Sequence, residues 1–104
     1  MSADPSAYTN PAQQRLMQLL LVLAGHEITG IAPSDIAREM GCAAPKVTRD
    51  MANLLLGGFA ELVPETGRWR LAPRVVQIAT RHMAALDRAE KRLVETRNRF
   101  SRTG

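Results

Sequence analysis

The 104-residue sequence is poor in the residues that build disulfides, metal sites and aromatic surfaces. It contains one Cys, two His and four aromatic residues. A single Cys cannot form an internal disulfide, and with two His it leaves little from which to build a metal cage. Four aromatic residues provide little surface for stacking unpaired bases, which argues against single-stranded nucleic acid as a partner. We therefore expect neither a metal nor a cofactor.

Long apolar runs and catalytic motifs are absent as well. The longest unbroken apolar run, residues 19–24, is far shorter than the ~20 residues that span a bilayer. The N-terminus lacks the basic and apolar regions of a signal peptide. The sequence contains no Gly-rich phosphate loop, nucleophile elbow or paired-carboxylate pattern. These features predict a soluble cytoplasmic protein that is not an enzyme and does not bind membranes.

The positive charge lies in the C-terminal third. The net charge of +4 arises from 14 basic and 10 acidic residues. Residues 1–72 hold six basic and seven acidic residues, for a net of −1, whereas residues 73–104 hold eight and three, for a net of +5. A basic protein favours a polyanionic partner. The partner surface therefore has to be sought from the positions of individual side chains.

Residue patterns predict a short series of helices followed by a hairpin. Residues 1–10 are small and polar and are expected to form a flexible N-terminal arm. Asn10 and Pro11 start a helix that Gly25 ends, and Pro33 starts a second helix that ends at Gly41. A third helix runs from about residue 44 to the Gly57–Gly58 pair. Residues 28–31 are long enough only for a single edge strand or a turn.

The hairpin follows the third helix. Residues 59–63 and 68–71 are β-prone runs on either side of a turn with Pro64 and Gly67. Alternation along the second run puts Trp69 and Leu71 on one side, with Trp69 as a core anchor, and Arg68 and Arg70 on the other. The predicted fold is mainly α with a small β-hairpin wing. It comprises a winged helix-turn-helix domain over residues 11–72 and a long basic C-terminal helix over residues 73–104.

Three segments of the chain resemble a known family. They are Pro33-Ser34-Asp35-Ile36-Ala37-Arg38-Glu39-Met40-Gly41, Gly58-Phe59-Ala60-Glu61 and Pro64-Glu65-Thr66-Gly67-Arg68-Trp69-Arg70-Leu71-Ala72-Pro73-Arg74. Together they are similar to the N-terminal DNA-binding domain of the IclR family of bacterial transcriptional regulators, over residues 12–80. The resemblance implies a third helix in the major groove, a wing on the backbone or minor groove, and a dimer that binds a palindromic site in double-stranded DNA.

The third helix has a polar face that suits DNA. With Val47, Met51, Leu54 and Leu55 as its apolar stripe, a step of 100° per residue places other side chains opposite. Lys, Arg, Asn and Thr side chains hydrogen-bond base edges and phosphates. We expect Lys46 and Arg49 to contact bases and Asp50 to lie on a flank. The complete expected DNA-binding set on this helix is Pro45, Lys46, Thr48, Arg49 and Asn53, and that on the wing is Thr66, Arg68 and Arg70.

The C-terminal helix carries a seven-residue repeat. Ala79, Leu86, Leu93 and Phe100 form one row, with Val75 and Ala89 in a companion row that His82 and Thr96 interrupt. Such a heptad row predicts dimerisation with a second copy. Packing of this helix on the first helix is the alternative. Basic residues decorate the same helix, and two of them are candidate contacts to flanking phosphates, namely Arg74 and Arg81.

The favoured function is that of a sequence-specific, homodimeric DNA-binding transcriptional regulator of bacterial or phage type. The alternative is a protein-interaction adaptor that uses the winged scaffold and its C-terminal helix. IclR-family regulators continue from the wing into an effector-binding domain, whereas this sequence ends. Sensing of a small-molecule effector is therefore not expected, and the initial Met1 with its polar terminus favours a complete small protein.

Overall fold

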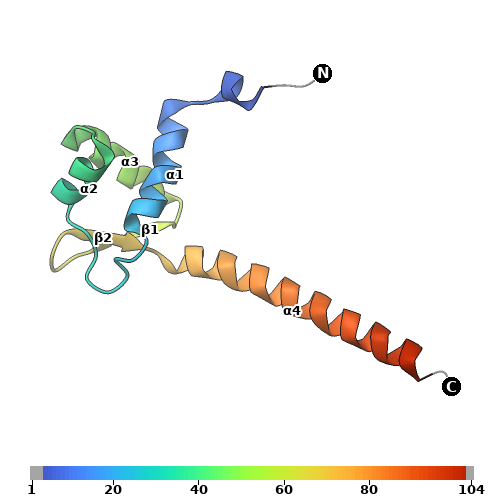
Figure 1. Cartoon of the computed structure of the whole chain (residues 1–104). Coiled ribbons are helices and arrows are strands. Elements are labelled where there is room, and N and C mark those ends of the chain that lie inside the picture. Colours follow the sequence, from blue (N-terminus) through green and yellow to red (C-terminus); the bar gives the residue numbers. More distant parts are fainter. Residues whose placement is uncertain (1–3, 103–104) are drawn as a thin grey trace. The chain divides into compact units, whose positions relative to one another are not determined.

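The structure, a computed structural model, describes residues 4–102 and has the expected winged helix-turn-helix fold followed by a long helix (Figure 1). Within these residues, four α-helices and an antiparallel hairpin confirm the predicted fold class. The chain divides into two compact units, and the boundary in the sequence follows Pro73. The elements are a 3-10 turn (Pro5–Tyr8), α1 (Pro11–Leu23), α2 (Pro33–Met40), α3 (Ala44–Leu56), β1 (Ala60–Val63), β2 (Arg68–Leu71) and α4 (Pro73–Ser101).

The helix boundaries follow the predicted start and stop residues. The Asn10 side-chain oxygen accepts hydrogen bonds from the backbone N–H groups of Ala12 and Gln13, at 2.9 and 3.2 Å. These bonds satisfy two of the donors that every helix N-terminus leaves without an intrahelical partner. Gly41 ends α2 at φ = 65°, in the left-handed region that glycine adopts without a steric penalty.

The 3-10 turn ahead of α1 was not expected from the sequence. Asp4 caps it by accepting a hydrogen bond of 3.1 Å from the Ser6 N–H, which lowers the pKa of the Asp4 carboxyl. Residues 4–10 are all exposed. Residues 1–3 of the predicted arm, and residues 103–104 of the predicted C-terminal segment, lie outside the described residues.

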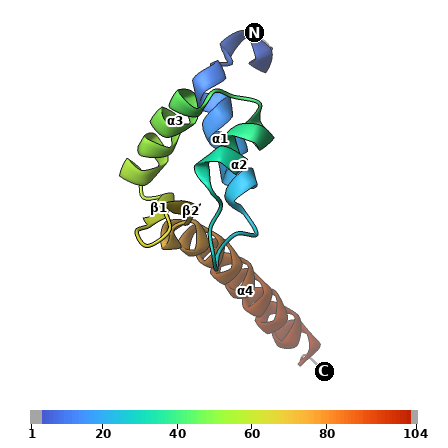
Figure 2. The same cartoon turned by 90° about the vertical axis from the view of Figure 1, so that its left-hand side faces the viewer.

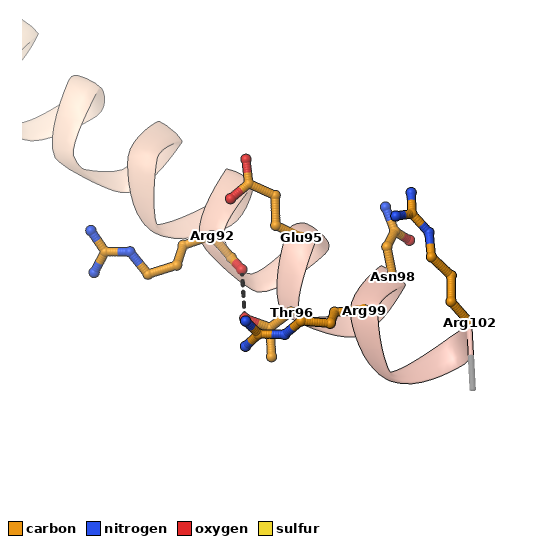
Figure 3. A pocket seen from close by; sticks show the side chains of 6 residues that line it. All are labelled: Arg92, Glu95, Thr96, Asn98, Arg99 and Arg102. Carbon is orange, nitrogen blue, oxygen red and sulfur yellow. Dashed lines mark hydrogen bonds between the residues drawn. The ribbon is translucent and has the colours of Figure 1, made fainter.

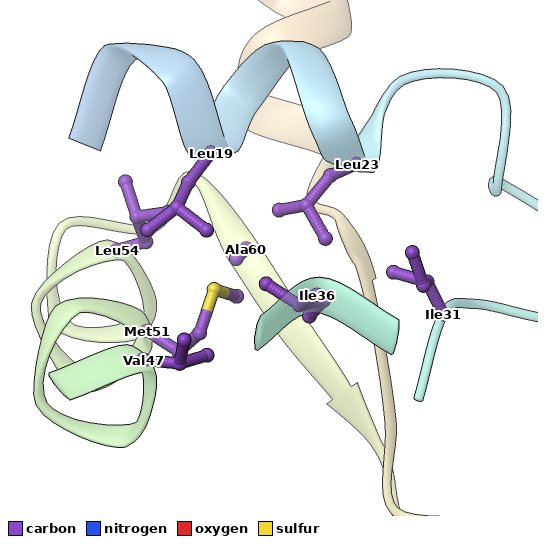
Figure 4. Close-up of a cluster of buried hydrophobic side chains, with 8 residues drawn as sticks. All are labelled: Leu19, Leu23, Ile31, Ile36, Val47, Met51, Leu54 and Ala60. Carbon is purple, nitrogen blue, oxygen red and sulfur yellow. The ribbon is translucent and has the colours of Figure 1, made fainter. Parts of the chain in front are cut away.

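One apolar core holds the winged unit together. Its buried side chains come from α1, α2, α3, β1 and the loop before α2, and Figure 4 shows them converging between these elements. Leu19, Leu23, Ile36 and Met51 are at most 1% exposed. Burying one such side chain contributes about 1.5–3 kcal/mol, so this cluster fixes α3 against the rest of the unit. The buried cluster consists of Leu19, Leu23, Ile31, Ile36, Val47, Met51, Leu54 and Ala60.

The hairpin is attached to the helical part through Ile31. β1 and β2 pair antiparallel, with Leu62 opposite Trp69. Ile31 and Trp69 also exchange two backbone hydrogen bonds of 2.8 and 2.9 Å, so residue 31 acts as a minimal third strand. A Cβ on Gly30 would lie 2.9 Å from the Trp69 carbonyl oxygen, and its φ is +76°. Glycine is therefore required beside the wing.

The helix α4 forms the second unit and contains no buried residue. It runs for 29 residues, with apolar side chains such as Leu86 and Leu93 half or more exposed. Among residues 4–102, no helix is both long and apolar enough to cross a membrane.

Candidate nucleic-acid interface

The outer face of α3 presents all of the side chains predicted to bind DNA. Pro45, Lys46, Thr48, Arg49 and Asn53 are exposed. Val47, Met51 and Leu54 lie on the opposite side and are at most 5% exposed. Figure 2 shows α3 along one side of the winged unit, with α1 and α2 beside it. The core therefore holds the rear of this helix and leaves its polar face to solvent.

Two predictions on α3 were wrong. Asp50 is 8% exposed rather than flanking the outer face, and Leu55 is 45% exposed rather than part of the apolar stripe. The buried set is Val47, Asp50, Met51 and Leu54, so the centre of the buried face is rotated towards Asp50. At 100° per residue, this rotation brings position 50 inside and turns position 55 outward.

Asp50 forms an ion pair that joins α3 to α1. The guanidinium of Arg15 donates from Nε to Asp50 Oδ2 at 2.8 Å and from Nη2 to Oδ1 at 3.4 Å. The hydrogen bond to Asp50 raises the pKa of the Arg15 guanidinium. The pair therefore adds a polar link between α1 and α3 to the apolar contacts of the core.

Sequence reasoning missed this pair, although a signal was present. Arg15 is the sole charged residue of α1, and Asp50 is the sole acid of α3. Because α1 offers no acid to Arg15, an acid on another helix is the partner to expect.

Two of the polar side chains on α3 use hydrogen-bonding capacity within the helix. Thr48 Oγ1 donates to the Ala44 carbonyl at 3.1 Å, and Asn53 Nδ2 donates to the Arg49 carbonyl at 2.9 Å. Each keeps acceptor capacity at its side-chain oxygen, and Asn53 keeps a second N–H. Lys46 and Arg49 are accordingly the stronger donors of this face.

The tip of the wing brings Thr66 and Arg68 together. Arg68 is exposed, and its backbone N–H donates to Thr66 Oγ1 at 3.3 Å. Both residues line an open groove of about 450 Å³, together with Ile28, Thr29 and Val63. The groove lies between the loop before α2 and the wing, so the Arg68 cation borders an open surface.

Arg70 differs from Arg68 in that it is engaged within the protein. Its Nε donates to Glu61 Oε1 at 2.6 Å across the hairpin, and its Nη1 donates to the Ile28 carbonyl at 3.5 Å. The side chain is about one third exposed. On the other side of β2, Trp69 and Leu71 pack against the core, which confirms the predicted alternation and the role of Trp69 as an anchor.

Ion pairing divides the six basic residues of the winged unit into two groups. Arg15, Arg38 and Arg70 are paired with Asp50, Asp35 and Glu61, respectively. Among the described residues of this unit, no acidic oxygen lies within 4.0 Å of the other three cations. Those three are Lys46, Arg49 and Arg68. The uncompensated positive charge therefore lies on the outer face of α3 and on the wing.

On α4, Arg74 and Arg81 are exposed and seven residues apart, so they share one side of the helix. Further along, a hollow of about 420 Å³ opens between arginine side chains (Figure 3). No ion pair is formed by the α4 cations within the described residues. The hollow is lined by Arg92, Glu95, Thr96, Asn98, Arg99 and Arg102.

The row of α4 that the sequence predicts to form a dimer is exposed. It consists of Ala79, Leu86, Leu93 and Phe100.

No protein-family model and no curated protein matches the sequence. Within residues 4–102, three or more His, Cys, Asp or Glu side chains nowhere gather closely enough to hold a metal ion.

Solved structures provide the comparison. An IclR transcriptional regulator from Alicyclobacillus acidocaldarius matches with a TM-score of 0.65 and 21% identity, over 72% of this chain and 30% of its own. An IclR family transcriptional regulator from Brucella abortus matches with a TM-score of 0.64 and 18% identity, over 81% of this chain and 31% of its own. A protein from Silicibacter sp. TM1040, described as an IclR transcriptional regulator, matches with a TM-score of 0.65 and 28% identity. The match covers 78% of this chain and 32% of that protein.

The chain thus spans about one third of the length of the regulators that it matches. That extent agrees with a single DNA-binding domain, and the resemblance expected from the sequence motifs is confirmed. In its fold and over this length, the chain is similar to the IclR family of transcriptional regulators.

Proposed function

We propose that the protein is a sequence-specific regulator of transcription that binds double-stranded DNA with α3 in the major groove and the hairpin on the backbone or minor groove. One observation carries the proposal: the three unpaired cations of the winged unit, Lys46, Arg49 and Arg68, all lie on these two elements. The similarity to regulators of transcription supports it. Such a regulator acts in the cytoplasm of a bacterium or phage-infected cell.

The contacts divide by role. Arg49 and Lys46 reach base edges, because both are long donors on the exposed face of α3, with Pro45, Thr48 and Asn53 around them. Thr66 and Arg68 hold the wing on the phosphate backbone, which fixes the position of the protein without selecting a sequence. Arg70 supports the wing, because its guanidinium is held by Glu61.

The protein binds as a homodimer to a palindromic site. Support comes from the exposed heptad row on α4, which a second copy would cover. Arg74 and Arg81 contact phosphates that flank the two half-sites, because both are exposed cations on one side of α4.

Selection from randomised duplexes with the purified chain tests this function. The expected result is an enriched site with two inverted half-sites, whose spacing reports the dimer geometry. An enriched site without a repeat would contradict the dimeric mode, and absence of any enrichment at moderate salt would contradict specific binding. If a variant with both Lys46→Ala and Arg49→Ala keeps the biological activity of the wild-type protein in cells, that result would favour the alternative function of a protein-interaction adaptor.

A further inference from the structure

The side chains along α4 distinguish between two ways in which a second copy can lie against it. The seam of the helix consists of the row of Ala79, Leu86 and Leu93 and its companion row, in which His82, Ala89 and Thr96 follow at heptad spacing. Leu86 is 50% and Leu93 is 60% exposed. The seam is thus an unpartnered face within the described chain, and its residue order carries information about the partner's direction.

In a parallel pair, each seam residue meets its own copy. Leu86 and Leu93 would then each face an equal leucine, whereas Ala89 would face Ala89 and leave space, and two His82 side chains would meet. The flanking rows conflict as well, because Arg92 of one helix would lie beside Arg97 of the other. Two such arginine pairs would form in each parallel dimer, and like charges at these positions oppose association.

In an antiparallel pair centred between Asp87 and Arg88, large side chains meet smaller ones. Leu86 faces Ala89 of the second copy, and Leu93 faces its His82. Facing residues of unequal size interdigitate, so each leucine fills the space that a smaller residue leaves. Ala79 faces Thr96 in the next layer.

The charges beside the seam also fit the antiparallel pair. Arg92 faces Ala85 of the second copy, Arg97 faces Val76, and Glu90 faces Met83. Every charged residue of the two flanking rows from position 76 to position 97 thereby lies beside an uncharged one. Its stem can cover apolar surface while the charged end stays in water.

We propose that α4 is an interaction surface for a second copy of this chain and that the two helices run antiparallel, with Leu86 packed on Ala89 of the second copy. The inference rests on the proposed homodimer and adds its direction and register. At a rise of 1.5 Å per residue, the starts of the two α4 helices lie about 43 Å apart along the axis. That is the order of the half-site separation of one DNA turn, about 34–36 Å.

Disulfide trapping tests the register in a Cys42→Ser background, which removes the sole native cysteine. Leu93→Cys protein mixed with His82→Cys protein is expected to cross-link under mild oxidation into a heterodimer, whereas Leu93→Cys alone is not. Efficient cross-linking of Leu93→Cys alone would overturn the direction. Circular dichroism of each variant verifies that the helix is retained.

A distance measurement gives a second readout that does not perturb the seam. Spin labels on Gln77→Cys, an exposed position outside the seam and its flanking rows, are expected about 32 Å apart along the axis. A separation below about 20 Å indicates parallel helices, since paired helices lie 8–10 Å apart. Sedimentation of a monomer at high concentration would overturn the inference, and the site selection above would still decide DNA binding independently.

Arg97→Glu provides a matched charge test. In the antiparallel pair, residue 97 faces Val76, so the dimer dissociation constant is expected to change less than about twofold. In a parallel pair the same substitution turns two Arg–Arg contacts into Glu–Arg contacts and would tighten the dimer by about fivefold or more. Tightening of that size contradicts the inference.

Discussion

The winged unit and α4 distribute their charge in opposite ways. Residues 1–72 carry a net charge of −1, yet ion pairs engage Arg15, Arg38 and Arg70 and leave three cations unpaired on α3 and the hairpin, namely Lys46, Arg49 and Arg68. Residues 73–104 carry a net charge of +5, and their cations are spread along a helix without a core. The comparison teaches that net charge does not reveal which cations of the winged unit are unpaired, because ion pairing depends on the fold.

The largest expected effect is on the free energy of unfolding, because side chains are buried in the winged unit and exposed on α4. Met51→Ala removes a fully buried side chain and is expected to lower the free energy of unfolding by about 2–5 kcal/mol, because a cavity remains between α1 and α3. Val94→Ala on α4, where the side chain is 49% exposed, is expected to change it by less than about 0.5 kcal/mol. Urea unfolding followed by the fluorescence of Trp69 measures both. Equal costs would contradict the contrast between the two regions.

The next effect tests whether an unpaired cation selects bases. Arg49→Ala is expected to weaken binding to the selected site by about 1–3 kcal/mol and to relax the preference at one base pair, because a donor to a base edge is lost. Competition titration against a duplex changed at that base pair measures both quantities.

Arg38→Ala is the matched control, since Arg38 lies in the same motif but is paired with Asp35. Its loss is expected to leave the base preference unchanged. If Arg38→Ala relaxes selectivity as much as Arg49→Ala does, ion pairing does not mark the binding surface.

A smaller effect compares two arginines on one strand. Arg68→Ala is expected to reduce the slope of log K against log salt by about 0.9 without altering selectivity, because one phosphate contact and its counterion release are lost. Arg70→Ala is expected to leave that slope unchanged, because its guanidinium is engaged with Glu61. Titrations at four or more salt concentrations provide the slopes. A change of slope for Arg70→Ala alone would reverse the assignment.

The smallest effect concerns the cations at the start of α4. Arg74→Ala and Arg81→Ala, made singly, are expected to lower affinity for a duplex with long flanks and to leave affinity for the minimal site unchanged. Each lowers the salt slope on the longer duplex by at most about 0.9, the value for one phosphate. Comparison of the two duplex lengths measures the effect. An equal loss on both lengths would assign these arginines to the minimal site.

Local sequence was sufficient for most of the fold. Asn10, Pro33 and Gly41 predicted helix boundaries because capping, a fixed φ and a left-handed residue act within one turn of the chain. The alternation around Trp69 likewise predicted which side of the hairpin meets the core. The 3-10 turn at residues 5–8 was missed, since it depends on a single capping bond from Asp4.

The site could be predicted only in part. The outer face of α3 followed from its period, but the burial of Asp50 and the exposure of Leu55 did not, because Asp50 pairs with Arg15, which is 35 residues away in the chain. The same holds for Arg70, whose alternation was predicted but whose pairing with Glu61 required the register of the hairpin.

The sequence by itself determined the order of elements, the winged fold and the likeness to the IclR family, because caps, turn residues and hydrophobic periods are short-range properties. The tertiary structure decided which cations remain available. The arginines of the winged unit differ in whether the fold places a carboxylate beside the guanidinium. Arg15, Arg38 and Arg70 have such a partner. Arg49 and Arg68 do not. For Arg15 and Arg70, packing of distant segments and strand register created the pairing that composition could not reveal.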